Sequence, residues 1–284
     1  MQEPPAPVDI SVLTIVRNRE PHLHQLIEGL TRSRLQPDEL IVVDMSDCPV
    51  KPPLAPFPIA VHRLEGTGLP LAKARNLAAK HAAQDNLVFL DVDCIPMTDC
   101  LTRLVQELGC HNGLLCADIR YLGPDDARGE WTEADLLARG RPHSARLFPA
   151  TGVREEPNPG LFWSLAFAIR RSSFAALGGF DEAFEGYGAE DTDFGFRARD
   201  ARLPLLFVGG AIACHQHHDS HEPPVQHLKD IVQNATLFHR RWNRWPMEGW
   251  LSAFQSMGLI EWTPQQVRLV RMPDSEEIAA TKVA

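Results

Sequence analysis

The chain has 284 residues, of which 44% are apolar and 23% are charged, and its net charge is −9. This length can bury one large core or a core with an appendage, and the composition is typical of a globular protein. A nucleic-acid binder usually carries a basic face, so the acidic balance argues against a nucleic-acid partner. No apolar run reaches the roughly 20 residues that span a bilayer, and the opening MQEPPAPVD lacks the regions of a signal peptide. The six cysteines show no C-x-x-C spacing, which is typical of a reduced, cytoplasmic protein.

Apolar β-forming runs alternate with helical patterns along most of the chain. Strands are predicted at 10–16, 39–44, 59–64, 87–90, 113–118, 161–169 and 205–214. Helices are predicted at 23–30, 69–81, 101–108, 171–177 and from 190 onward. A strand, a helix and a parallel strand in succession form a right-handed βαβ unit. The alternation therefore predicts a doubly wound α/β sheet.

Two regions depart from this alternation. Residues 123–159 are rich in Pro, Gly, Arg and acidic residues, and a loop this long is typically a functional lid or a disordered stretch. Residues 225–242 have the pattern of an amphipathic helix, a Trp-rich segment follows, and the tail from 273 is expected to be loose. We therefore predict a main domain over 1–222 and a helical appendage with a loose tail over 223–284.

A pair of carboxylates ends the strand predicted at 87–90. Asp91 and Asp93 are two residues apart, so in an extended segment both side chains point the same way. Ligands bind at the carboxyl ends of strands in open α/β sheets, and paired carboxylates suit a hard divalent cation. Two solvated loop aspartates are the alternative interpretation, because an isolated D-x-D is a common pattern.

Five blocks in the right order make the chain resemble an inverting glycosyltransferase of the GT-A fold and family 2 type. They are SVLTIVRNR, ELIVVDMSD, LAKARNLAAKHA, LDVDCIP and GGFDEAFEGYGAEDTDFGFR, and the resemblance covers residues 9–222. The last block also resembles the G-x-G-x-E-D segment of galactosyltransferases and chondroitin polymerases. The resemblance implies metal-dependent transfer of a sugar, with inversion, from a nucleotide diphospho-sugar such as a UDP-sugar to an acceptor hydroxyl of a glycan or other molecule.

On the donor side, the resemblance implies that Asp93 binds Mn²⁺ or Mg²⁺, with Asp91 at the ribose or a metal-bound water. It places Asp44 at the nucleotide base, and Arg17 and Arg75 at the nucleotide or its diphosphate. Asp44 as a turn-capping aspartate and Arg75 as a surface arginine are the structural alternatives.

On the acceptor side, the resemblance assigns the general base to Asp191 and the binding of acceptor hydroxyls to Glu190. The attacking hydroxyl must lose a proton, which requires a base on that side. Carboxylates are also favourable at a helix N-terminus, by 0.3–1 kcal/mol each, so their acidity alone is not diagnostic. The glycines of the G-x-G pair, Gly186 and Gly188, would leave room for a sugar to approach the backbone.

Aromatic residues supply further candidates for the acceptor site. Tyr187 and, less strongly, Trp163 and Trp131 are candidates to stack on sugar faces, with core or lid packing as the alternative. The stripe of Trp242, Trp245 and Trp250 is better explained by packing of the appendage, with a peripheral membrane contact as the other interpretation.

A histidine run, HQHHDSH, follows the last predicted strand at 215–221. In the glycosyltransferase interpretation one of these histidines completes the metal site; His215 fits best and His217 is the alternative. The run also approaches the H-x-H-x-D-H signature of metal-dependent hydrolases, but with wrong spacing. A hydrolase and a catalytically silent sugar-binding module therefore remain open, and the sequence names neither the sugar nor the acceptor.

Overall fold

A computed structural model describes residues 9–66 and 68–283; residues 1–8 of the predicted main domain, Thr67 and the last residue of the predicted tail lie outside the described part. The strands of the main sheet are β1 Ile10–Val16, β2 Glu39–Asp44, β3 Ile59–Arg63, β4 Asn86–Leu90, β5 Cys94–Pro96, β6 Leu114–Tyr121, β7 Arg141–Pro142, β8 Val153–Glu155, β9 Ala166–Arg170 and β10 Leu205–His215. The helices beside it are α1 Glu20–Arg32, α2 Leu71–His81, α3 Cys100–Cys110, α4 Glu133–Arg139, α5 Arg171–Ala176 and α6 Glu190–Asp200. The predicted α/β class is confirmed.

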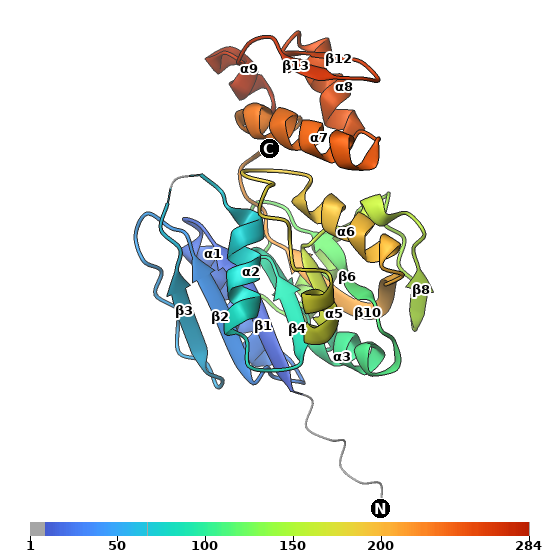
Figure 1. Ribbon diagram of the computed structural model, residues 1–284. Helices are drawn as coiled ribbons and strands as arrows, with labels where there is room; N and C mark the ends of the chain where they lie inside the picture. Colours follow the sequence, from blue (N-terminus) through green and yellow to red (C-terminus); the bar gives the residue numbers. More distant parts are fainter. Residues whose placement is uncertain (1–8, 67, 284) are drawn as a thin grey trace, which may run out of the picture.

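The sheet is mixed and its backbone order is β3-β2-β1-β4-β9-β6-β10-β5. The first four of these strands are parallel, and all seven residues of β1 are buried, as expected for a strand covered on both faces. β9 pairs antiparallel with both β4 and β6, so it joins the N-terminal half of the sheet to the later strands. The carboxyl ends of the parallel strands point toward the appendage in Figure 1.

Two apolar clusters cover the two faces of the sheet. One contains Leu23 and Leu26 of α1 with Leu101 and Leu104 of α3, packed on alternate side chains of the strands. The other contains the alanine face of α2 together with side chains of α5 and α6. In this cluster the rings of Phe89, Phe167, Phe174, Phe180 and Phe194 form a connected set of contacts. Helices thus lie on both faces, which holds the strand ends rigidly at one edge of the sheet.

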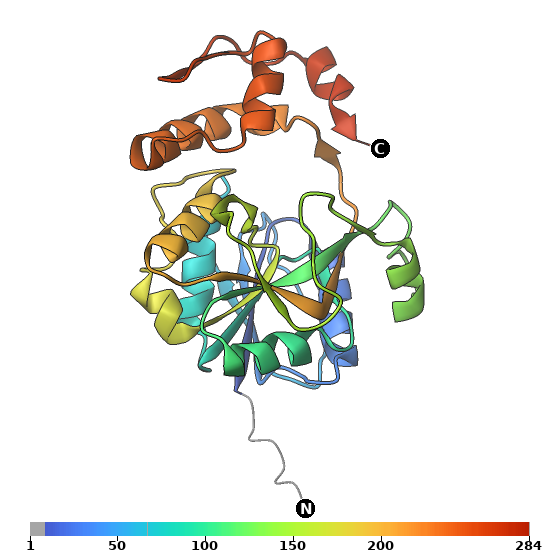
Figure 2. The ribbon, with the colours of Figure 1, turned by 90° about the vertical axis from the view of Figure 1, so that its right-hand side faces the viewer.

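The appendage lies across that edge (Figures 1 and 2). It comprises α7 Leu228–Trp242, α8 Glu248–Ser256, a hairpin of β12 Ile260–Trp262 and β13 Val267–Leu269, and α9 Ser275–Ala280. Its own apolar core includes Val225, Leu228, Leu251 and Phe254. The predicted helical character is confirmed for this region, with the hairpin as an addition.

The expectation of a loose tail is wrong for the described residues. The tail forms α9, capped by Asp274, and then β14 Lys282–Val283. β14 pairs with β11 Ser220–His221, the last two residues of the histidine run. The Asp274 capping box and this backbone pairing provide the order that the weak apolar pattern did not predict.

The segment predicted as a lid or a disordered loop is partly regular. It contains α4, which begins with a capping box at Thr132, and the short strands β7 and β8, which pair with β6 and β10. Across the described residues we find no helix with the length and apolarity needed to cross a membrane.

Candidate active site

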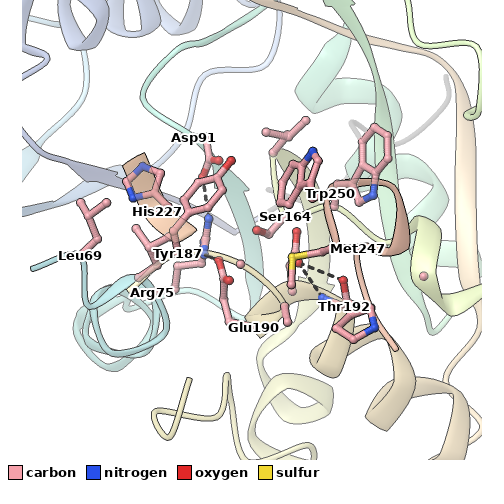
Figure 3. A pocket seen from close by; sticks show the side chains of 18 of the residues that line it. Leu69, Arg75, Asp91, Ser164, Tyr187, Glu190, Thr192, His227, Met247 and Trp250 are labelled. Carbon is pink, nitrogen blue, oxygen red and sulfur yellow. Dashed lines mark hydrogen bonds and ion pairs between the residues drawn. The ribbon is translucent and has the colours of Figure 1, made fainter. Parts of the chain in front are cut away.

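A cavity of about 1550 Å³ lies between the carboxyl edge of the sheet and the appendage. Its lining comes from the ends of β1, β2, β4 and β10, from the start of α6, and from the connection between α7 and α8. Figure 3 shows part of this lining. Pockets for one small molecule are typically ~300–1,000 Å³, so this cavity has room for two substrates at once.

Asp93 lines the cavity and lies beside two histidines, His215 and His218. An Asp93 carboxylate oxygen lies 3.4 Å from Nε2 of His215, and the other oxygen lies 3.5 Å from Nε2 of His218. One ligand atom from each residue lies within 4.8 Å of the other two. Burial would raise the pKa of Asp93, but His215 and Arg19 hold it below its usual value. The set fits a divalent cation that accepts both imidazole and carboxylate ligands.

The histidine assignment from the sequence needs one correction. The structure brings His218 to Asp93 beside the predicted His215, whereas the predicted alternative, His217, is not in this group. Asp91 also lies outside the group. His221 instead bonds through Nδ1 to Thr281 of the tail, at 3.1 Å. Within the described part of the chain, two of the four histidines of the run therefore belong to the metal-ligand group.

Arg19 is a site residue that the sequence analysis missed. Its Nη1 donates to Asp93 Oδ2 at 2.6 Å, and its side chain is 35% exposed. The guanidinium is partly exposed and lies on the carboxylate oxygen that also faces His218, so a cation bound to that oxygen would displace it. The signal was present in the second arginine of the RNR segment that follows β1.

Arg75 lies between two pairs of acidic residues that the sequence analysis singled out, Asp91 with Asp93 and Glu190 with Asp191. Its side chain is 6% exposed, and its two terminal nitrogens lie 3.1 Å from Asp91 Oδ1 and 3.1 Å from Glu190 Oε1 (Figure 3). Burial raises the pKa of Asp91 to about 6 and that of Glu190 to about 7, with Arg75 opposing both shifts. Arg75 lines the cavity, but the structure places it between carboxylates and does not leave it free for a diphosphate.

Asp191 enters the cavity from the first turn of α6. Ala189, with a φ of 69°, turns the chain directly before the helix so that Glu190 and Asp191 both line the cavity. Burial raises the pKa of Asp191, although Arg75 and the backbone groups of Thr192 and Ser164 oppose the shift. A buried carboxylate with a raised pKa is a better proton acceptor than a solvated one.

Residues 164 and 165 lie between the two carboxylate sites. The Ser164 backbone bonds the carboxylate of Asp191, and the Leu165 carbonyl accepts from the Asp91 amide at 2.8 Å. Two adjacent residues at the entry to β9 therefore contact both ends of the candidate site.

Arg17 and Met45 form the wall beside the end of β1. Both line the cavity, together with the apolar side chains of Ile15, Leu69 and Leu71. Nη1 of Arg17 is buried and has no hydrogen-bond partner among the described residues. An unpaired buried cation suits a phosphate or another anion.

Asp44 does not line the cavity, whereas the next residue in the chain, Met45, does. The Asp44 side chain is fully buried, and it accepts from the amides of Ser46 and Val50 and from Arg63 Nη1 at 2.6 Å. Burial would raise its pKa, but these three donors lower it. The structure thus favours the turn-capping alternative over the predicted contact with a base.

Substitution of Asp44 should therefore affect folding more than ligand binding. Asp44→Ala leaves two backbone amides without an acceptor, so we expect the free energy of unfolding to fall by about 2–3 kcal/mol in urea titrations. The lowered pKa means that this stabilisation is present above the ordinary value of 3.8 and is lost as the pH falls through the folded-state value. Asp47→Ala, in the same turn but exposed, is the control. Normal stability with impaired nucleotide binding in Asp44→Ala would contradict this role.

The aromatic candidates divide by location. Tyr187 lines the cavity and stacks on His227 of the appendage at 4.5 Å, and Trp163 lines it beside His143 at 4.7 Å. Trp131 is buried under Arg32, outside the cavity. Trp245 and Trp250, for which appendage packing or a membrane contact was expected, also line the cavity.

Comparisons with known proteins show the family of the chain. The model of "Glycosyl transferase family 2" matches residues 11–178, and that of "N-terminal domain of galactosyltransferase" matches residues 157–221. The fold is of the GT-A type. The chain belongs to glycosyltransferase family 2.

Individual relatives match over shorter stretches. An uncharacterized glycosyltransferase, YwdF, of Bacillus subtilis (strain 168) is 38% identical over 35% of this chain and 38% of its own length. An N-acetylglucosaminyl-diphospho-decaprenol L-rhamnosyltransferase of Mycobacterium tuberculosis is 30% identical over 44% of this chain and 38% of its own length. The matches thus span well under half of these curated relatives.

Two solved structures share the fold. GalNAc-T7 with UDP, GalNAc and Mn²⁺ has a TM-score of 0.54 and 19% identity, and covers 74% of this chain and 43% of its own. The mannosyltransferase PcManGT from Pyrobaculum calidifontis, in complex with GDP-Man and Mn²⁺, has a TM-score of 0.54 and 15% identity, and covers 90% and 76%.

Proposed function

We propose that the protein transfers a sugar from a nucleotide diphospho-sugar to an acceptor hydroxyl, with inversion and with the help of a divalent metal. The observation that carries this proposal is the presence, in and around one cavity, of a metal-ligand group and a separate pair of carboxylates. The first group suits the leaving diphosphate, and the second suits the attacking hydroxyl.

Asp93, His215 and His218 would hold the metal. One carboxylate and two imidazoles suit Mn²⁺ better than Mg²⁺, which prefers oxygen ligands. A bound cation of this kind acts as a Lewis acid that stabilises the charge on the departing diphosphate. Arg17 is the buried cation available to bind the diphosphate or another anionic part of the donor.

The acceptor would bind on the α6 side. Glu190 binds an acceptor hydroxyl through Oε2, which is buried and has no partner among the described residues. The acceptor oxygen forms a bond to the anomeric carbon as the bond from that carbon to the phosphate oxygen breaks. The nucleotide diphosphate leaves with the electron pair, and Asp191 takes the proton of the hydroxyl. A single displacement of this kind inverts the anomeric carbon.

Metal-dependent nucleotide binding tests the first half of the proposal. UDP and GDP are both needed as probes because structures with this fold carry either nucleotide. Calorimetry should give at least about tenfold tighter binding of one of them with Mn²⁺ than with EDTA, because charge-assisted contacts contribute about 1.5–3 kcal/mol. Equal affinity with Mn²⁺ and with EDTA would remove the metal from the proposal.

Release of nucleotide from a sugar donor tests the second half of the proposal, which is the transfer to an acceptor. We expect a panel of UDP- and GDP-sugars to include one donor from which nucleotide is released, and released faster with an acceptor glycan. Binding without any nucleotide release would instead identify a sugar-nucleotide binding module. Zinc binding without nucleotide, lost on substitution of each of several histidines, would point to a hydrolase.

A further inference from the structure

The appendage contacts the chain on both sides of Glu190 and Asp191. We infer that helix α7 belongs to the catalytic apparatus, with Asn234 and Arg241 as positioning residues that hold these two carboxylates in place. The inference rests on the proposed function for the roles of Glu190 and Asp191. It goes beyond that function by assigning work to a helix outside the part of the chain that the family models match.

The first anchor lies before Glu190. Asn234 is completely buried in α7, and its Nδ2 donates to the carbonyl oxygens of Glu185 and Gly188, at 2.9 Å each. An amide nitrogen shared by two carbonyls three residues apart fixes the curvature of the loop between them. This loop leads directly into the left-handed turn at Ala189 from which α6 begins.

The G-x-G pair provides independent support for this anchor. A Cβ at Gly186 would lie 2.2 Å from Asp230 Oδ2, and a Cβ at Gly188 would lie 2.9 Å from Met247 Sδ. Both glycines have positive φ values, 75° and 97°. The appendage therefore occupies the space that a side chain at either glycine would need, although Gly188 itself lines the cavity. The loop backbone packs directly on the appendage.

The second anchor lies after Asp191. Asp193 is completely buried, and one of its oxygens, Oδ1, accepts from Arg241 Nη1 at 2.7 Å and from Trp242 Nε1 at 2.9 Å. Its other oxygen accepts from Arg197 of α6 itself at 2.8 Å. Arg241 also pairs with Asp181, so it ties the first turn of α6 to the segment that precedes the glycine loop.

Two anchors from one helix thus bracket the two carboxylates. A carboxylate that acts as a base must stay within hydrogen-bond reach of the acceptor hydroxyl, and a misplacement of about 1 Å can cost about 10²-fold in rate. Neither Asn234 nor Arg241 lines the cavity, so their effect would be on position and not on substrate contact.

The test compares Asn234→Ala with two controls. Thr236→Ala alters the same helix at a hydroxyl that bonds only within it, and Phe254→Leu weakens the appendage core without removing a hydrogen bond to the loop. With the most active donor of the UDP- and GDP-sugar panel, we expect Asn234→Ala to lower kcat by about 10²-fold. Affinity for the nucleotide with Mn²⁺ should stay within twofold, and Arg241→Gln should behave in the same way.

A merely structural role would give a different pattern. Phe254→Leu would then lower kcat as much as Asn234→Ala at a matched loss of Tm, and that result would overturn the inference. Unchanged kcat in Asn234→Ala would also overturn it. If the wild-type protein releases no nucleotide from any donor, the proposed function fails, but hydrogen exchange still tests the anchor. Amides of residues 185–192 should then exchange faster in Asn234→Ala and not in Thr236→Ala; equal exchange in both would overturn it.

Discussion

Asp191→Asn is expected to lower kcat by about 10²–10⁴-fold, the usual contribution of a general base. Asparagine keeps the shape of the side chain but cannot accept the proton of the acceptor hydroxyl. Affinity for the nucleotide with Mn²⁺ should change little, because Asp191 is not in the group formed by Asp93, His215 and His218. Initial-rate transfer and nucleotide calorimetry on the same preparation measure the two effects.

Two further variants serve as comparisons for Asp191→Asn. Asp200→Asn removes an exposed carboxylate from the other end of α6 and should keep the wild-type kcat. Glu190→Gln should mainly raise the KM for the acceptor, because the work proposed for Glu190 is binding. Near wild-type kcat in Asp191→Asn would exclude it as the base. Asp193 would not replace it, since three donors occupy its oxygens.

Asp93→Ala should abolish the metal dependence of nucleotide binding and most of the turnover. A metal that stabilises a departing diphosphate contributes several kcal/mol, and 1.36 kcal/mol is tenfold in rate, so kcat should fall by about 10³-fold. Nucleotide affinity in Mn²⁺ should fall to the value measured in EDTA. Calorimetry of both conditions, beside the rate assay, measures these effects.

Neighbouring histidines provide the matched control for this prediction. His218→Ala should weaken the metal-dependent part of nucleotide binding, whereas His217→Ala should leave it unchanged, because His218 belongs to the group around Asp93 and His217 does not. Metal dependence that survives in Asp93→Ala, or that disappears in His217→Ala alone, would refute the ligand set.

The parallel part of the fold could be predicted because buried parallel strands are continuous apolar runs, and β1, β2 and β4 are runs of this kind. The direction of β9 could not, because the same apolar pattern fits either orientation. Its antiparallel placement between β4 and β6 depends on partners far away in the sequence. The ordered tail was missed for a related reason: its strand pairing is with residues 220–221.

The candidate site also has one part that the local sequence pattern predicts and another part that depends on the assembled fold. Asp91 and Asp93 were found because their place at a strand end follows from local pattern alone. The choice between His217 and His218, and the inward turn of Asp44, depend on how a loop folds after a strand ends, which spacing does not encode. The bridge from Arg75 to Asp91 and Glu190 joins residues 16 and 115 positions away. Such contacts arise only from the assembled sheet.

The two adjacent residues Ser164 and Leu165, which contact Asp191 and Asp91, have a consequence for the order of folding. They enter β9, the strand that inserts between β4 and β6 and so joins the N-terminal parallel strands to the later ones. Asp91 and Asp191 can therefore reach their final positions only after this insertion. An intermediate with the N-terminal parallel strands alone would contain Asp91 and Asp93 but would lack both the histidines and the base. In refolding experiments, high-affinity nucleotide binding should appear together with the last kinetic phase and not with the first burial of the sheet.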